Sequence, residues 1–536
     1  MICLTLPAWA RTWNAKTDWH ATGDGQTDDS RAIQRGVSAM GSGDTVVFPA
    51  PGNYVVASTV HFQARAIRVK CERGAALVGP NRGTDIFDNL QSYTAIGGSA
   101  TSGCIFRGGG VQAYGRGSDG GQTLDQALTN LTFTYNTFEN MTYGPNNFRS
   151  NGGIFIGGGS NHVVIRHNTF SNIMPYDEGY NAAAKTYLEQ YEPDGNAARA
   201  AIWFYGGSNY SIDHNTFLHN YQDIKGCQGQ QFQAENMLIH HNFSDSHHRM
   251  FMEINSGGGC GNPTYNAGIA NFQVYDNFDL NAGGRRPEAN TFGLSAPFSQ
   301  AKQPGSDVLT SIPMSGVVWY NNLLKGVVND NEYVGIGIEV GARDMKIYNN
   351  TIMAQWPLAG YSFGGTEGGY MQDNFACLTT PSRAKTPYFG DSNGKTTTTY
   401  LRNRVSGACP PGLRSLDVAL GPVTNAGGTL TAIATVNTVE FGIQGVVFAI
   451  DGRYVSAVMG SGPYKLNYGA ANLSSGPHTV TATVVDAVGV LAVSARQNAT
   501  TTGHVGPSGP IAPNVDPAKQ DFDIAGNSDD PINGRH

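Results

Sequence analysis

The sequence predicts an all-β protein built as a solenoid of stacked coils, followed by a smaller β-sandwich. Three observations support this class: a short segment ending in Asn recurs along most of the chain, apolar residues alternate within each repeat, and the pattern changes after Pro410-Pro411-Gly412. The alternation has the two-residue period of strands and not the longer period of helices. Gly is abundant, at 70 of 536 residues, which suits a fold with many tight turns.

The repeat is marked by asparagines in segments such as IRHNTF, IDHNTF and IYNNT. Successive asparagines are 32, 47, 27, 35, 45, 28 and 24 residues apart, so the short separations give the coil and the long ones carry inserted loops. Stacked coils bury a continuous core, and an Asn at the same turn of each coil can form an amide ladder. The predicted ladder consists of Asn136, Asn168, Asn215, Asn242, Asn277, Asn322, Asn350 and Asn374.

This ladder and the opening TDWHATGDGQTDDSRAIQRGV…GDTVVFPAPGNYVV, residues 17–56, resemble the pectate-lyase-like β-helix superfamily. The resemblance covers residues 15–405 and implies a right-handed parallel β-helix, closed at its start by an amphipathic capping helix near Asp28–Met40. The superfamily includes hydrolases, lyases, epimerases and phage adhesins, so the fold by itself does not name the function.

The chain is expected to divide into four parts. Residues 1–10 are predicted to be the remnant of a signal peptide, 11–410 a catalytic β-helix, 415–503 an immunoglobulin-like domain and 504–536 a disordered tail. Ala8-Trp9-Ala10 has the small-x-small shape of a cleavage site, although no basic segment precedes it. The run FAIDG…PYKLNY…SSGPHTVTATVVDAVG resembles bacterial immunoglobulin-like domains of secreted carbohydrate-active enzymes, which serve as spacers or weak binders more often than as catalysts.

Cysteine usage indicates a secreted protein, either extracellular or periplasmic. Without Cys3, six cysteines remain, and in order they form pairs 33, 33 and 32 residues apart: Cys71, Cys104, Cys227, Cys260, Cys377 and Cys409. Six cysteines allow several connectivities, so the pairing stays open. No CxxC motif is present, which favours structural disulfides over a metal or redox site.

Charge and hydropathy restrict the partners. The net charge of −7 gives no basic surface for nucleic acid, and no apolar run is long enough to cross a membrane. A polysaccharide or oligosaccharide is the expected partner, and the oligomeric state stays open. No cofactor and no metal are expected, except for calcium if the protein is a lyase.

Candidate site residues lie on the strand upstream of each asparagine, in GIFIGGGSN, AIWFYGGSN, RMFMEINSG and GIGIEVGAR. Strand alternation predicts that ten apolar residues point inward: Ile154, Ile156, Ile202, Phe204, Met250, Met252, Ile254, Ile336, Ile338 and Val340. The residues between them should form two outward rows. The first row is predicted to hold Phe155, Trp203, Asp223, Phe251 and Gly337. The second is predicted to hold Gly157, Tyr205, Lys225, Glu253, Gly293 or Ser295, and Glu339.

The second row suggests a carboxylate pair, Glu253 and Glu339, two coils apart. Strands are about 4.8 Å apart, so the carboxyl groups should be separated by about 9–10 Å, which leans toward an inverting glycosidase. Glu253 is expected to be the acid because of its apolar neighbours, although Lys225 opposes this. The aromatic row, Phe155, Trp203 and Phe251, with Tyr205 beside it, is predicted to bind sugar rings. The alternatives are that the glutamates are ordinary surface residues and that the aromatic residues pack beneath a loop.

A second cluster lies in NFSDSHHRMFMEIN, where His247, His248 and Arg249 precede Glu253. These side chains are candidates for binding substrate or for acid–base catalysis, with a hydrogen-bonded turn as the equal alternative. The insertion at residues 173–200 also contains acidic residues, namely Asp177, Glu178, Glu189 and Glu192, and one of these could supply a catalytic carboxylate.

Three functions are compatible with the sequence. A secreted polysaccharide-degrading glycoside hydrolase is the first, and the DD and NTD motifs of the polygalacturonase branch are absent from the Asn-containing turns, so pectin hydrolysis is not supported. The second is a polysaccharide lyase or epimerase that uses Lys225, Arg249 or the histidines, with Asp223 and Glu253 as calcium ligands. The third is a non-catalytic glycan-binding adhesin.

Overall fold

The computed structural model describes residues 10–501 except for 81–84, 100–101, 114–127, 143–151, 158, 175–199, 228–233, 246, 248–249, 258–268, 283–293, 301–313, 327–333, 339–341, 355, 361–367, 379–398, 407–416, 438–442, 452, 460–461, 471–472, 474 and 487–490. Near the ends of several strands, and throughout Leu294–Gln300 and Val334–Ile338, it describes the backbone alone.

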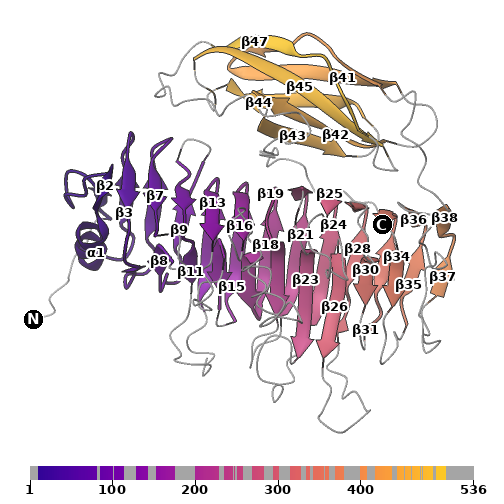
Figure 1. Cartoon of the computed structure of the whole chain (residues 1–536), viewed down its shortest axis with the longest axis horizontal. Helices are drawn as coiled ribbons and strands as arrows, with labels where there is room; N and C mark the ends of the chain where they lie inside the picture. The colour runs from indigo at the N-terminus through magenta and orange to yellow at the C-terminus, as the bar shows by residue number, and fades with distance from the viewer. Residues whose placement is uncertain are drawn as a thin grey trace, which may run out of the picture.

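The described strands between Thr12 and Ser406 form three parallel sheets that run side by side along the molecule (Figure 1). Successive coils add parallel strands to each sheet, so residues far apart in sequence become neighbours across coils. This arrangement confirms the predicted all-β parallel β-helix.

Sheet A has 15 strands. They are β1 (Thr12–Asn14), β3 (Thr45–Phe48), β6 (Arg68–Cys71), β9 (Ala95–Gly97), β12 (Thr129–Thr134), β15 (Asn161–Arg166), β18 (Gly207–Asp213), β21 (Ala234–His240), β24 (Ile269–Tyr275), β27 (Met314–Ser315), β28 (Val318–Tyr320), β31 (Ala342–Arg343), β32 (Lys346–Tyr348), β35 (Tyr370–Gln372) and β37 (Thr399–Leu401).

Sheet B has 13 strands. They are β2 (Asp24–Asp28), β4 (Asn53–Val55), β7 (Ala76–Val78), β10 (Ile105–Arg107), β13 (Thr137–Thr142), β16 (Thr169–Met174), β19 (Thr216–Leu218), β22 (Phe243–Asp245), β25 (Phe278–Ala282), β29 (Leu323–Gly326), β33 (Thr351–Ala354), β36 (Phe375–Leu378) and β38 (Arg404–Ser406).

Sheet C has 10 strands. They are β5 (Val60–His61), β8 (Phe87–Asp88), β11 (Val111–Ala113), β14 (Ile154–Ile156), β17 (Ala200–Tyr205), β20 (Gln222–Cys227), β23 (Met250–Gly257), β26 (Leu294–Gln300), β30 (Val334–Ile338) and β34 (Trp356–Gly360).

The asparagine ladder lies at the turn between sheets A and B. In each step the side-chain oxygen of one Asn accepts bonds from the backbone and side-chain amides of the Asn one coil earlier, at 2.9–3.1 Å from Asn136 to Asn403. All eight predicted members take part, and Asn403 adds a ninth that the sequence pattern did not include. The ladder satisfies buried polar groups that would otherwise oppose burial of this turn.

The interior of the β-helix is filled by equivalent residues of successive coils. Phe106, Phe138, Phe170 and Phe217 form a stack on sheet B, with ring centroids 5.0, 5.1 and 5.2 Å apart. On sheet C, six of the residues predicted to point inward are buried in the same core: Ile154, Ile156, Ile202, Phe204, Met252 and Ile254. The side chains of Met250, Ile336 and Ile338, and the whole of Val340, lie outside the described residues.

The predicted capping helix is present as α1 (Ser30–Ala39). It covers the first coil with Ala32, Ile33 and Val37. A Cβ at Gly36 would lie 2.0 Å from the Trp19 ring, so the close packing of α1 on the first coil requires glycine there. The helix thereby covers one end of the core, which a stack of strands leaves open.

A second, antiparallel unit follows the β-helix and lies beside the stack of coils in Figure 1. Its first sheet contains β39 (Asp417–Leu420), β40 (Thr424–Ala426), β41 (Thr429–Asn437) and β44 (Tyr464–Gly469). Its second contains β42 (Ile443–Ile450), β43 (Arg453–Met459), β45 (Gly476–Asp486), β46 (Leu491–Val493) and β47 (Gln497–Thr501). The unit has its own buried core, and two antiparallel sheets are compatible with the predicted immunoglobulin-like domain.

The structure contains the disulfide Cys71–Cys104, which joins the first two of the six cysteines and links neighbouring coils. Cys260 and Cys409 lie outside the described residues, as do residues 1–9 of the predicted signal segment at 1–10. Among the residues described, no helix has the length and apolar character needed to cross a membrane.

Candidate active site

Sheet C presents a continuous outer row of side chains at one register position. The register pairs Phe155 with Trp203, Trp203 with Lys225, and Lys225 with Glu253. Beyond these, Glu253 pairs with Ser295 and Ser295 with Gly337. Four coils therefore bring an aromatic pair, a cation and a carboxylate into one line.

This register corrects the predicted rows. Lys225 and Glu253 lie in the row of Phe155 and Trp203, whereas the sequence alignment put them in the row of Tyr205. Tyr205 pairs with Cys227 instead. Lys225 and Glu253 do lie on the outer face, but the predicted alignment of β17 with β20 was shifted by two residues. Strand alternation determines the face on which a side chain lies and does not determine the hydrogen-bonded register.

The predicted pairing of Glu253 with Glu339 in a single row is also wrong. The position that continues the Glu253 row on β30 is Gly337. Glu339 itself lies outside the described residues, as do His248, Arg249 and the acidic residues of the insertion at 175–199. The separation of 9–10 Å expected for the carboxyl pair therefore has no basis in the register.

Two residues predicted to face outward, Phe251 and Asp223, are in fact buried inside the β-helix. Phe251 is fully buried in the main core, where its ring centroid lies 6.2 Å from that of Phe217. Its neighbour Met252 belongs to the same core, so two consecutive residues face inward at the start of β23. Ala201 and Ile202 do the same at the start of β17. This break in alternation at the corner between sheets B and C is what the two-residue period failed to predict.

Asp223 occupies the same corner position on β20 and is also fully buried. Its carboxylate accepts hydrogen bonds from the Asn220 amide at 3.0 Å and the Ser244 hydroxyl at 2.5 Å. Burial raises the pKa of Asp223 to about 7, while the charge of His247 and the two hydrogen bonds oppose this. Asp223 is therefore poised between its neutral and charged forms near neutral pH, and it does not belong to the outer row.

His247, predicted to contact substrate, is likewise buried. Its Nε2 atom lies 3.0 Å from the carboxylate of Asp279, and both side chains have no exposed surface. Ser244 and Asp279 continue the sheet B row of Phe217, one and two coils further along. Asp223, Ser244, His247 and Asp279 thus form a polar cluster within the core. The sequence carried a signal for it, because the NTF of earlier coils becomes NFS and NFD in these two.

On the outer face, Glu253 is held by two residues of the preceding strand. Gln222 donates a hydrogen bond from Nε2 to Glu253 Oε2 at 2.8 Å, and Lys225 Nζ lies 3.7 Å from the same oxygen. The side chains of Lys225 and Glu253 are only 1% and 4% exposed. Burying two charges is costly unless they are paired and hydrogen-bonded, as they are here. Sequence analysis missed Gln222, because alternation from Ile224 predicted an inward side chain.

The aromatic residues form a cluster beside this ion pair. The ring centroids of Phe155 and Trp203 are 6.0 Å apart. The Tyr205 centroid lies 5.6 Å from that of Phe155 and 5.5 Å from that of Trp203. Lys225 Nζ lies 5.2 Å from the Trp203 ring, within the range of a cation–π contact. Phe155 and Trp203 are 4% and 9% exposed, so they do not form the open stacking platform that the sequence suggested. Tyr205 is the one member that is partly exposed.

Trp203 contributes a polar group as well as a ring. Its indole Nε1 is buried, and no described residue accepts a hydrogen bond from it. A buried donor without an acceptor costs about 1–3 kcal/mol, so such a group calls for an explanation. An acceptor supplied by a bound ligand, such as a sugar hydroxyl, would satisfy it.

The two residues suggested as calcium ligands do not share a position. Asp223 is bonded inside the corner, while Glu253 is bonded on the outer face to Gln222 and Lys225. A calcium ion needs six to eight converging oxygen ligands, and this pair does not begin such a set.

Fold and site together define a parallel β-helix with buried polar residues on the outer face of sheet C. Residues 13–192 match the sequence model of the family described as rhamnogalacturonase A/epimerase, pectate lyase-like. This match confirms the resemblance drawn from the opening segment and the asparagine ladder. No curated protein matches the chain.

Solved structures similar to this chain include three with different roles. They are PfbA, a surface adhesin of Streptococcus pneumoniae (15% identity, 74% of this chain and 91% of that one, TM-score 0.37), a family 28 exopolygalacturonase of Yersinia enterocolitica (12%, 74% and 79%, 0.37), and a mutant tailspike protein of E. coli bacteriophage HK620 in complex with a pentasaccharide (10%, 91% and 92%, 0.39). These likenesses leave substrate and chemistry open.

Proposed function

We propose that this protein is a polysaccharide-acting enzyme, and specifically a glycoside hydrolase with Glu253 as a catalytic carboxylate. The observation that carries the proposal is the buried Glu253, held by Gln222 and Lys225 beside an aromatic cluster on the outer face of sheet C. A buried ion pair is weak evidence for a role in stability, and a buried ionisable group with a specific charge partner is a candidate for a functional site. The family match to a rhamnogalacturonase A/epimerase model also supports a polysaccharide substrate.

Hydrolysis of a glycosidic bond needs one group that protonates the leaving oxygen and another that activates water. An ammonium 3.7 Å away favours the charged form of a carboxylate, so Glu253 suits the role of base better than that of acid. The Trp203 indole N–H and the Tyr205 ring are suited to hold a sugar beside it. For the second carboxylate we keep Glu339 as a candidate although it is not in the row of Glu253, and His248 and Arg249 as further candidates; all three lie outside the described residues.

A polysaccharide lyase or epimerase is the second proposal, and the buried Lys225 favours it. A cation beside a carboxylate on the substrate face could stabilise the negative charge that develops when the proton at C5 of a uronate is removed. We also propose that the protein is secreted, because the disulfide Cys71–Cys104 is typical of proteins in oxidising compartments.

The test is a screen of neutral and acidic polysaccharides that follows reducing ends and near-ultraviolet absorbance together. Reducing ends without absorbance indicate hydrolysis, and both signals together indicate a lyase. Exchange of the C5 proton without cleavage indicates an epimerase. Binding without turnover on any polymer would contradict catalysis and identify an adhesin.

Glu253→Gln is the decisive variant, since it keeps the shape and the contact with Gln222 while removing the charge. We expect it to lower kcat/KM at least 100-fold on the substrate that the screen identifies. Glu235→Gln is the matched control, because Glu235 lies on β21 of sheet A and should leave activity unchanged. Full activity in Glu253→Gln would overturn the site assignment.

A further inference from the structure

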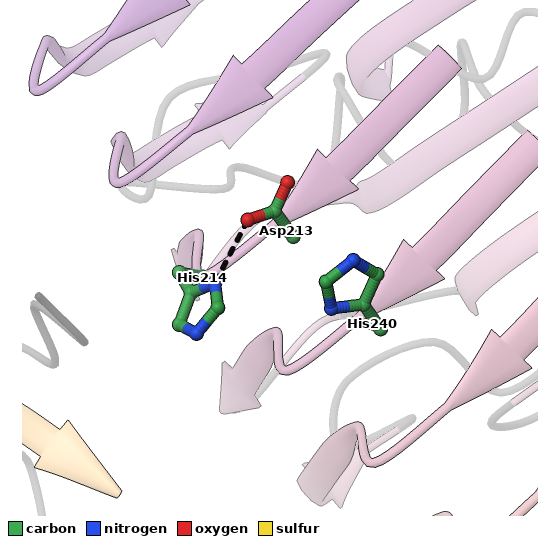
Figure 2. Close-up of side chains that lie close together, drawn as sticks. All are labelled: Asp213, His214 and His240. Atoms are coloured by element: carbon green, nitrogen blue, oxygen red, sulfur yellow. Dashed lines mark hydrogen bonds and ion pairs between the residues drawn. The ribbon is translucent and has the colours of Figure 1, made fainter. Parts of the chain in front are cut away.

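A second polar cluster lies away from sheet C, at the turn between sheets A and B. Asp213 ends β18 and His240 ends β21, and the sheet register places the two directly opposite each other. His214 follows Asp213 in a left-handed conformation with φ of 53°. Figure 2 shows the three side chains gathered at the ends of adjacent strands.

The three side chains lie close enough together to hold a metal ion after a small adjustment. One ligand atom from each of Asp213, His214 and His240 lies within 4.8 Å of the others. Two ligands of one zinc ion stand at most about 4.2 Å apart, since each bond is about 2.1 Å, so a small side-chain adjustment would close the site. The histidines are partly exposed, which leaves an approach from solvent.

Neighbouring residues fix the orientation of the ligands. The His214 ring stacks on that of His241 with centroids 5.0 Å apart, and the His240 ring stacks on that of Tyr275 with centroids 4.7 Å apart. Ser211 donates a hydrogen bond to Asp213 Oδ1 at 2.6 Å. Such supporting contacts orient ligands in metal sites and hold the required geometry.

One neighbour opposes a cation. Arg166 Nε donates to Asp213 Oδ2 at 2.5 Å, and His214 Nδ1 lies 2.8 Å from the same oxygen. An incoming ion has to share Asp213 with the guanidinium or displace it, and it meets a like charge. Arg166 should therefore set the affinity of the site to a moderate value.

We propose that Asp213, His214 and His240 bind one divalent first-row transition ion of the zinc or cobalt class. Two imidazole nitrogens and one carboxylate oxygen suit these ions, whereas calcium and magnesium prefer all-oxygen sites. The ion joins neighbouring coils, because Asp213 and His214 belong to one coil and His240 to the next. It therefore stabilises the stack and lies apart from the proposed catalytic row on sheet C.

The test is titration of the full chain with Co²⁺, followed by its visible absorption, and with Zn²⁺, followed by calorimetry and thermal unfolding. We expect one equivalent to bind and the midpoint of unfolding to rise with metal concentration. His214→Asn and His240→Gln should each weaken binding at least tenfold. Asn tolerates the left-handed conformation, so His214→Asn tests the ligand and not the backbone.

His162→Asn is the matched control, since His162 is an exposed, left-handed histidine on β15 outside the cluster, and it should bind as the wild type does. Arg166→Gln should tighten binding by removing the competing cation. The proposal is overturned if the wild type binds neither ion, or if His214→Asn and His240→Gln retain wild-type stoichiometry and affinity. Weaker binding in Arg166→Gln would contradict the role given to Arg166.

Discussion

Asp223 is a carboxyl group inside the β-helix whose protonation links stability to pH. Burial raises its pKa to about 7 in the folded protein, from an ordinary value of 3.8. Between these two values the unfolded chain releases a proton that the folded chain keeps, so this group makes folding stability fall as pH rises toward 7 and level off above it.

Asp223→Asn should remove this dependence, because an amide is a neutral isostere that can still bond Asn220 and Ser244. We expect the variant to lose less stability than the wild type between pH 4 and pH 7, and to be the more stable protein at pH 8. Thermal unfolding across this pH range measures the difference. Parallel curves for the two proteins would show that Asp223 titrates normally.

The ion pair of Lys225 and Glu253 gives a second prediction at the scale of residues. Lys225→Met leaves a nearly buried carboxylate without its cation, which should cost about 3–5 kcal/mol of folding free energy. Adding Glu253→Gln should recover much of that loss, since the remaining groups are then neutral. Denaturant unfolding of the two single variants and the double variant measures the coupling, and simple additivity would argue against a buried pair.

The asparagine ladder is the element that repeats most regularly along the chain. Asn277 is fully buried, accepts bonds from Asn242 and donates to Ile239, Tyr275 and Asn322. Asn277→Ala should therefore cost about 2–4 kcal/mol, because several buried groups lose their partners together. Asn403→Ala, at the partly exposed end of the ladder, should cost less. Equal losses measured by chemical denaturation would contradict this dependence on burial.

At the scale of strands, the sequence pattern predicted which residues face inward better than it predicted the register between strands. It predicted the ladder and the six described inward residues of sheet C, because these depend on local periodicity and on one repeated residue type. The capping helix was implied instead by the family resemblance of the opening segment. The pattern misplaced Phe251, since two consecutive residues face inward at the corner before β23. It also aligned Trp203 with Asp223 instead of Lys225, because strand alternation is unchanged by a shift of two residues.

The two large hydrophobic cores in the described parts of the molecule are separate, one in the β-helix and one in the sandwich. Leu466 is fully buried in the second core, and Leu466→Ala should cost about 2–5 kcal/mol there. If the two units unfold independently, calorimetry should show two transitions, with only one shifted by this variant. A single transition that moves as a whole would instead show that the units unfold together.

Spacing along the chain and repeated residue types were enough to predict the solenoid, its ladder and the strands that carry Glu253, Lys225 and Trp203. The helix that closes the solenoid was implied by the resemblance of residues 17–56 to the β-helix superfamily. Only the folded structure showed which residues of neighbouring coils lie beside one another. It pairs Glu253 with Lys225 and Gln222, and it buries Asp223 and His247. It also places Asp213 opposite His240. Those contacts connect residues of different coils, and loops of unequal length separate the coils. Their register is therefore set by hydrogen bonding and packing across the sheet, which periodicity along one strand does not encode.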